Sequence, residues 1–85
     1  WIEDLICSYD WPCAEALAVA WCESRWQAAA ISGDGANFGL FQINAIHRAR
    51  VGGDLLQVLN AQRNTAVAYA IWQDQGWGPW ACKPY

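Results

Sequence analysis

The segment from Ala14 to Trp21 constrains the fold more than any other part of the chain, because Glu15 is its only polar residue. A helix with so little polar surface is buried on nearly all sides in a small domain. We therefore expect a helix over residues 11–24 that runs through the core, with Asp10 as the residue that starts it. The rest of the chain must then be arranged around this helix.

Glu23 lies at the end of this apolar run. On a helix its side chain shares a face with Ala16, Val19 and Ala20, and no lysine or arginine lies within the turn before it. Apolar surroundings disfavour the ionised form of a carboxyl group, so we expect the pKa of Glu23 to be raised. Such a group can donate a proton to a leaving group at ordinary pH, which makes Glu23 the candidate catalytic acid.

The four cysteines predict disulfides. A chain of 85 residues buries too little surface to be stable through its core alone, and two disulfides would supply the missing constraint. The cysteine spacings fit no common zinc site, so we expect no metal and no cofactor. Four cysteines allow three pairings, and the sequence pattern leaves all three open.

Composition excludes several other classes of protein. The net charge is −3 and the five basic residues form no stripe, which argues against binding to nucleic acid. No apolar run is long enough to span a membrane. Seven tryptophans exceed what so small a core can hide, so some of them are expected to line a groove, as in sugar-binding clefts, or to remain exposed.

The remaining elements follow from local patterns. Alternating side chains over residues 37–44 predict a short hairpin, which we call the lip, and the Ser32-Gly33-Asp34-Gly35 turn precedes it. Asn60 and Gly76 are suitable ends for a long helix. Further helices are expected over residues 1–8, 45–50, 55–59 and 61–75. We interpret residues 1–85 as a single monomeric domain cut from a longer secreted or multidomain chain.

Four motifs, taken together, carry a resemblance to a known family. They are Cys22-Glu23-Ser24-Arg25-Trp26, Gly39-Leu40-Phe41-Gln42-Ile43-Asn44, Ala68-Tyr69-Ala70-Ile71-Trp72 and Gly76-Trp77-Gly78-Pro79-Trp80. Their order and spacing resemble the lysozyme superfamily, in the branch of soluble lytic transglycosylases and goose-type lysozymes. The resemblance implies a mostly α, lysozyme-like α+β fold with a minimal β-hairpin beside a cleft, and Glu23 matches the family's catalytic acid.

The second catalytic carboxylate of a glycosidase is missing from its usual places. The resemblance places Asn37 and Asn44 where relatives carry carboxylates, and an amide can neither stabilise an oxocarbenium ion by charge nor act as a nucleophile. Asp34 lies one residue from the goose-type position, so it is the candidate for orienting or deprotonating water. The alternative is that Asp34 only hydrogen-bonds its own turn.

With a single carboxyl group, the resemblance implies the transglycosylase route. Glu23 would act first as acid and then as base, and the glycan's own 6-hydroxyl would close a 1,6-anhydro sugar. The expected substrate is the β-1,4 bond between N-acetylmuramic acid and N-acetylglucosamine in peptidoglycan. The alternatives are a hydrolytic lysozyme that uses Asp34, and an inactive module that only binds glycan.

Five residues are assigned to substrate binding, some from their pattern and some from the resemblance. Amide side chains on one face of the lip can bind saccharide groups or hold the hairpin together. Tyr69 matches a family tyrosine near the acid, or is anchored in the core by a hydrogen bond. Trp77 and Trp80 cover Glu23, stack on a sugar or only close the core. The five are Asn37, Gln42, Asn44, Tyr69 and Trp77. His47 is interpreted as a surface residue whose segment touches the peptide stems.

The resemblance also selects one disulfide pairing. In the family the C-terminal turn packs against the helix of the acid, which favours Cys22 with Cys82 and leaves Cys7 with Cys13. The first of these bonds would fix the residue next to Glu23.

Overall fold

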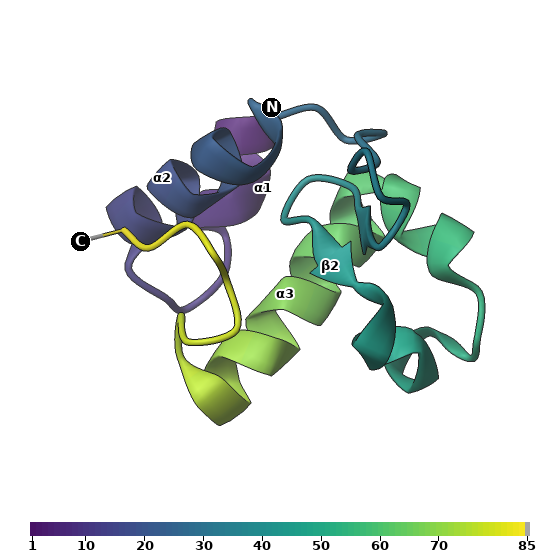
Figure 1. Ribbon diagram of the computed structural model, residues 1–85. Coiled ribbons are helices and arrows are strands. Elements are labelled where there is room, and N and C mark those ends of the chain that lie inside the picture. Colours follow the sequence, from purple (N-terminus) through teal and green to yellow (C-terminus); the bar gives the residue numbers. More distant parts are fainter. Residues whose placement is uncertain (85) are drawn as a thin grey trace.

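The computed structural model describes residues 1–84, and it confirms a mostly α fold with one small sheet. Helices α1 and α2 and the C-terminal segment form one side of the molecule, the sheet and the short 3-10 helices form the other, and α3 runs between them (Figure 1). The elements in chain order are α1 (Ile2–Cys7), α2 (Cys13–Ser24), β1 (Asn37–Phe38), β2 (Ile43–Asn44), the 3-10 helices η1 (Ala45–Val51) and η2 (Leu55–Leu59), and α3 (Ala61–Gln75).

Helix α2 is not buried on all sides, and this expectation from the sequence was wrong. Ala16, Val19 and Ala20 are fully buried, but Trp21 is 50% exposed and lies on an exposed stripe with Ala14 and Ala18. A domain of this size has too few elements to cover a helix on two sides. Alanine loses little when it stays in water, because its side chain is one methyl group.

The N-terminal end of α2 differs from the prediction, whereas its C-terminal end, Ser24, is the predicted one. Pro12, rather than Asp10, occupies the N-cap position. At the other end, Arg25 and Trp26 adopt left-handed backbone conformations with φ of 55° and 59°, so the helix stops directly after Ser24. The indole of Trp26 turns back and donates a hydrogen bond to the Leu17 carbonyl at 3.1 Å. This sharp stop leaves Glu23 in the last turn of the helix.

The lip is fastened to three separate elements. β1 and β2 pair in antiparallel register, with Asn37 opposite Asn44. The Ser24 hydroxyl on α2 donates to the Leu40 carbonyl at 2.7 Å, and the Trp80 indole donates to the Phe41 carbonyl at 2.8 Å. Because these anchors come from different parts of the chain, the position of the lip relative to Glu23 is set by the tertiary fold.

The third anchor is Asn64 on α3, whose side chain is fully buried. Its Oδ1 accepts from the Phe41 amide at 2.8 Å, and its Nδ2 donates to the carbonyls of Phe38 at 2.8 Å and Val58 at 2.9 Å. Gly39 has φ of +79°, and a Cβ there would lie 2.3 Å from Asn64 Nδ2. Glycine at this position therefore lets the lip approach α3 closely.

An aromatic cluster fills the core between α2, α3 and the C-terminal turn. Trp11 lies at its centre, with its ring centroid 5.3 Å from Phe41 and 5.5 Å from both Trp77 and Tyr69. Trp1 and Trp21 remain exposed, at 71% and 50%. The excess of tryptophan is thus divided between the core and the surface, as the composition indicated.

The four cysteines form two disulfides, Cys7 with Cys13 and Cys22 with Cys82. This is the pairing that the family resemblance implied. Within residues 1–84, no helix combines the length and the apolar character that a membrane span requires. Over the same residues, no three histidine, cysteine or acidic side chains come together as metal ligands.

Candidate active site

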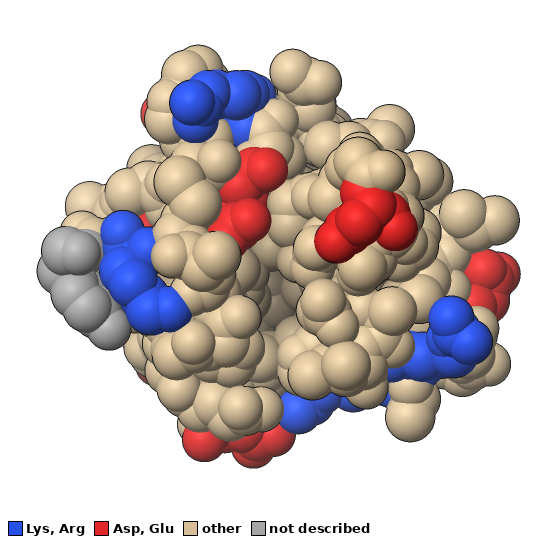
Figure 2. Space-filling model, in the orientation of Figure 1, with Lys and Arg blue, Asp and Glu red and all other residues tan. Residues whose placement is uncertain are grey.

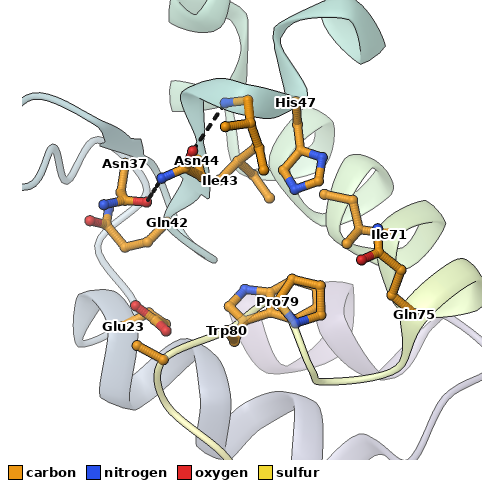
Figure 3. A pocket seen from close by; sticks show the side chains of 12 residues that line it. Glu23, Asn37, Gln42, Ile43, Asn44, His47, Ile71, Gln75, Pro79 and Trp80 are labelled. Carbon is orange, nitrogen blue, oxygen red and sulfur yellow. Dashed lines mark hydrogen bonds between the residues drawn. The ribbon is translucent and has the colours of Figure 1, made fainter.

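A pocket of about 530 Å³ lies between the lip, η1, α3 and the C-terminal turn. Figure 2 shows it as a hollow between two lobes, with acidic residues, drawn in red, on both sides of its upper end. In Figure 3, Glu23 lies at one end beside Asn37 and Gln42, His47 and Gln75 lie at the other end, and Trp80 lies between the two ends. The pocket is lined by Glu23, Asn37, Gln42, Ile43, Asn44, Ile46, His47, Ile71, Gln75, Pro79, Trp80 and Ala81.

Glu23 is the one carboxylate that lines this pocket among residues 1–84. Burial raises the pKa of Glu23, and this effect outweighs the hydrogen bond from the Cys82 amide and the positive charge of Lys83, which both lower it. The Cys82 amide donates to Glu23 Oε2 at 3.2 Å. A partly buried carboxyl group of this kind is suited to giving up a proton inside the pocket.

Asn37 and Asn44 both line the pocket, and they hold each other across the sheet. Asn44 Nδ2 donates to Asn37 Oδ1 at 3.1 Å, and Asn44 Oδ1 caps η1 by accepting from the Ile46 amide at 3.0 Å. Asn37 Nδ2 donates to the Ser32 hydroxyl at 3.4 Å. Each Nδ2 carries a second N–H, and no protein acceptor for it is found within residues 1–84, so both asparagines can donate to a ligand.

Gln42 lines the pocket with its amide in a fixed orientation. Its side-chain amide nitrogen, Nε2, donates to the carbonyls of Ala30 at 3.0 Å and Gly39 at 2.9 Å, and these two bonds use both of its N–H groups. The carbonyl oxygen of the side chain is the atom left for a ligand, and it can only accept a hydrogen bond. The backbone of Gln42 is left-handed, with φ of 51°, and the two hydrogen bonds offset part of that strain.

Asp34 does not line this pocket. It is fully exposed, and it accepts from the Ser32 hydroxyl at 2.5 Å and from the Ala36 amide at 3.0 Å. The hydrogen bond from Ser32 comes first among the causes that lower the pKa of Asp34. Asp34 is therefore ionised at neutral pH, and its contacts are those of a turn residue that bonds its own loop.

Tyr69 and Trp77, both predicted to bind substrate, lie in the aromatic cluster and do not line the pocket. The Tyr69 ring centroid is 5.0 Å from that of Tyr9 and 5.5 Å from that of Trp11. Trp77 is buried, and its indole donates to Glu15 Oε1 at 2.9 Å. Of the two tryptophans in the C-terminal turn, Trp80 is the one that lines the pocket.

His47 was interpreted from the sequence as a surface residue, but it lines the pocket opposite Glu23 (Figure 3). Burial, followed by the charge of Arg50, lowers the pKa of His47, so its imidazole is neutral at pH 7. Gln75 on α3 faces the same end. Asn44 caps η1 and so fixes where the helix that carries His47 begins, a signal that the sequence analysis did not use.

A comparison with protein families agrees with this geometry. The model of a family described as "Lysozyme like domain" matches residues 12–82. The chain belongs to this lysozyme-like family. Searches of curated proteins and of solved structures found no match. In this lysozyme-like domain the matched region includes every residue that lines the pocket, from Glu23 to Ala81.

Proposed function

We propose that this lysozyme-like domain is a lytic transglycosylase that cleaves the β-1,4 bond between N-acetylmuramic acid and N-acetylglucosamine in peptidoglycan. Membership of the family indicates glycosidase chemistry on a cell-wall glycan. The observation that carries the finer proposal is that a single carboxyl group, Glu23, lines the pocket within residues 1–84. Asn37 and Asn44 occupy the positions where the family resemblance implies a second carboxylate.

In the proposed reaction Glu23 gives its proton to the glycosidic oxygen while the bond from that oxygen to C1 breaks. The 2-acetamido group of the sugar supports the positive charge that develops at C1. The ionised Glu23 then takes the proton of the 6-hydroxyl as its oxygen bonds to C1. The product is a 1,6-anhydro sugar, no water is consumed, and Glu23 regains its proton.

The polar residues around Glu23 support a role in holding the glycan. Gln42 offers only an acceptor, which suits an N–H or O–H of the sugar, while Asn37 and Asn44 offer donors, which suit a carbonyl oxygen. An acetamido group presents one N–H and one carbonyl. Trp80 and Pro79 form an apolar surface between the two ends of the pocket, against which a sugar ring can pack.

The products decide between transglycosylation and hydrolysis. We expect mass spectrometry of digested peptidoglycan to show muropeptides that end in 1,6-anhydro sugars, about 18 Da lighter than reducing ends because no water is added. Reducing ends alone would contradict the proposal and would require a group that activates water. Replacing Asp34 by asparagine would then test whether Asp34 is that group.

The pH dependence of cleavage reports on Glu23. Glu23 must carry a proton to act as an acid. Because burial raises its pKa, the Glu23 side chain stays protonated to higher pH than an exposed glutamate side chain does. We expect the rate of glycan cleavage to fall as pH rises through the pKa of Glu23. The measurement is kcat/KM against pH in a buffer of constant ionic strength, and a rate that still increases above neutral pH would be inconsistent with this role.

The setting of the proposed reaction is outside the cytoplasm. Two disulfides and a lysozyme-like fold fit an extracytoplasmic protein, and we propose that the domain is secreted and works at the cell wall.

A further inference from the structure

The C-terminal segment after Trp80 lies against the end of α2 that carries Glu23. Cys82 is bonded to Cys22, the neighbour of Glu23, and its amide donates to Glu23 Oε2 at 3.2 Å. In Figure 1 this segment, drawn in yellow, turns back from the end of α3 and runs along α2. The carboxyl group therefore touches a part of the chain that the sequence motifs had linked to it only through a disulfide.

Lys83 follows directly, and its side chain folds back onto the C-terminal turn. Its ammonium group donates to the Gly78 carbonyl at 3.1 Å and also to the Trp80 carbonyl. Lys83 is exposed, and these two contacts hold its ammonium group against the C-terminal turn, which includes Trp80 of the pocket wall. The charge of Lys83 is one of the two influences that lower the pKa of Glu23 against the effect of burial.

Within residues 1–84, the other ionisable groups around the pocket are engaged elsewhere, distant from Glu23 or uncharged. The Arg25 guanidinium donates to the Trp21 carbonyl at 2.9 Å and lies 5.4 Å from the centroid of the Trp21 ring. His47 is at the far end of the pocket and neutral at pH 7. Asp34 is exposed and bonded to its own turn. Within residues 1–84, Lys83 is the cation next in the chain to Cys82, the residue whose amide donates to Glu23.

We infer that the Cys82 amide and the Lys83 ammonium stabilise the carboxylate form of Glu23 between its two proton transfers, with Lys83 as a positioning residue. This inference rests on the proposed function, because only a group that is first acid and then base must exist in both forms. Burial alone would make the carboxyl group hold its proton tightly. The Cys82 amide, which donates to Glu23 Oε2, and the positive charge on the next residue make release of that proton easier.

The first test measures Glu23 directly by NMR. The chain contains three glutamates, Glu3, Glu15 and Glu23, so glutamate labelled with 13C at the side-chain carboxyl gives three signals to titrate. The Glu23→Gln variant identifies the signal of Glu23. We expect Lys83→Met to raise the pKa of Glu23 and to leave the other two unchanged, because methionine keeps the length of the side chain and removes its charge.

Lys83→Arg is the matched control, since it keeps the charge. Its Glu23 titration should stay close to that of the wild type. If Lys83→Met leaves the Glu23 titration where it was, the inference is wrong. The wild-type Cys82 amide signal, followed by 15N NMR, should titrate together with Glu23, and a Cys82 signal that does not move with pH would also overturn it.

The second test uses catalysis. In Lys83→Met we expect the alkaline limb of kcat/KM against pH to move to higher pH, and kcat at the optimum to fall by about threefold to tenfold with little change in KM. Lys83→Arg should restore most of kcat. The failures are distinguishable: an active Glu23→Gln variant rejects the proposed function, whereas an inactive Glu23→Gln with an unshifted Lys83→Met profile rejects only this inference.

The two disulfides provide a further matched pair. Replacing Cys22 and Cys82 by serine frees the segment, so the pKa of Glu23 should rise. Replacing Cys7 and Cys13 removes a bond at the other end of α2, about 15 Å from Glu23 along the helix, and should leave that pKa unchanged. An equal response to both changes would contradict the inference. Lys83→Met keeps both bonds, so it decides the question even if a serine variant fails to fold.

Discussion

Replacing Glu23 by glutamine is expected to lower the rate at which the protein clears a suspension of peptidoglycan by about 10³-fold. Glutamine has nearly the same shape but no acidic proton, and no other carboxyl group within residues 1–84 lines the pocket to replace it. The loss should appear in kcat, because the proton is transferred in the transition state and glycan binding is largely preserved.

The same substitution should leave the fold intact. The amide oxygen of glutamine can still accept the hydrogen bond that the Cys82 amide donates to Glu23. Burial raises the pKa of Glu23 in the folded protein, so its stabilising effect is complete below the unfolded pKa and is lost as pH rises through the folded pKa. A neutral side chain avoids that loss. Above the folded pKa, the melting temperature of the variant should therefore equal or slightly exceed that of the wild type.

Glu15→Gln is the matched control for this experiment. Glu15 lies on the same helix and accepts a hydrogen bond from the Trp77 indole at 2.9 Å, outside the pocket. Its amide oxygen can accept the same bond, so we expect activity near that of the wild type. A Glu23→Gln variant that clears peptidoglycan as fast as Glu15→Gln would remove Glu23 from the mechanism. Wild-type protein that binds chitin oligomers without cleaving them would indicate a glycan-binding module instead.

Local sequence patterns predicted the helices well, because each depends on neighbours in the chain. Asn60 and Gly76 mark the two ends of α3, and the predicted span of residues 61–75 is the one observed. The sequence also predicted the direction of the pKa shift of Glu23, because it placed this residue at the end of an apolar helix whose Ala16, Val19 and Ala20 are buried. The lip was identified by its alternating pattern and by resemblance to the family.

The predictions that depended on tertiary packing were less reliable. The sequence does not distinguish a core tryptophan from one that lines a cleft. Trp77 is a core residue outside the pocket, whereas Trp80 is buried and also lines the pocket. The position of His47 depends on how η1 packs beside α3. The left-handed conformations of Arg25 and Trp26 also have no local signal, because neither residue favours them.

Asn64 is the clearest residue that the sequence did not reveal, and it leads to the second large effect. Replacing Asn64 by alanine would leave three backbone groups in the core without their partner: the Phe41 amide and the carbonyls of Phe38 and Val58. Each buried polar group left unpaired costs about 1 to 3 kcal/mol. We expect a loss of about 3 to 5 kcal/mol in the free energy of unfolding, a large part of the stability of a small domain.

Thermal unfolding followed by circular dichroism checks this prediction, with a melting temperature lowered by about 12 °C or more. Thr65→Val is the matched control, because Thr65 is equally buried on α3 but its hydroxyl bonds only the Ala61 carbonyl of its own helix, at 2.9 Å. Loss of this one hydrogen bond should lower the free energy of unfolding by about 1 kcal/mol or less. If Asn64→Ala melts within a few degrees of Thr65→Val, the lip does not depend on α3. If it melts far lower, the lip depends on Asn64 in addition to its anchors at Ser24 and Trp80, and glycan cleavage should be lost at the temperature where the Asn64 anchor fails.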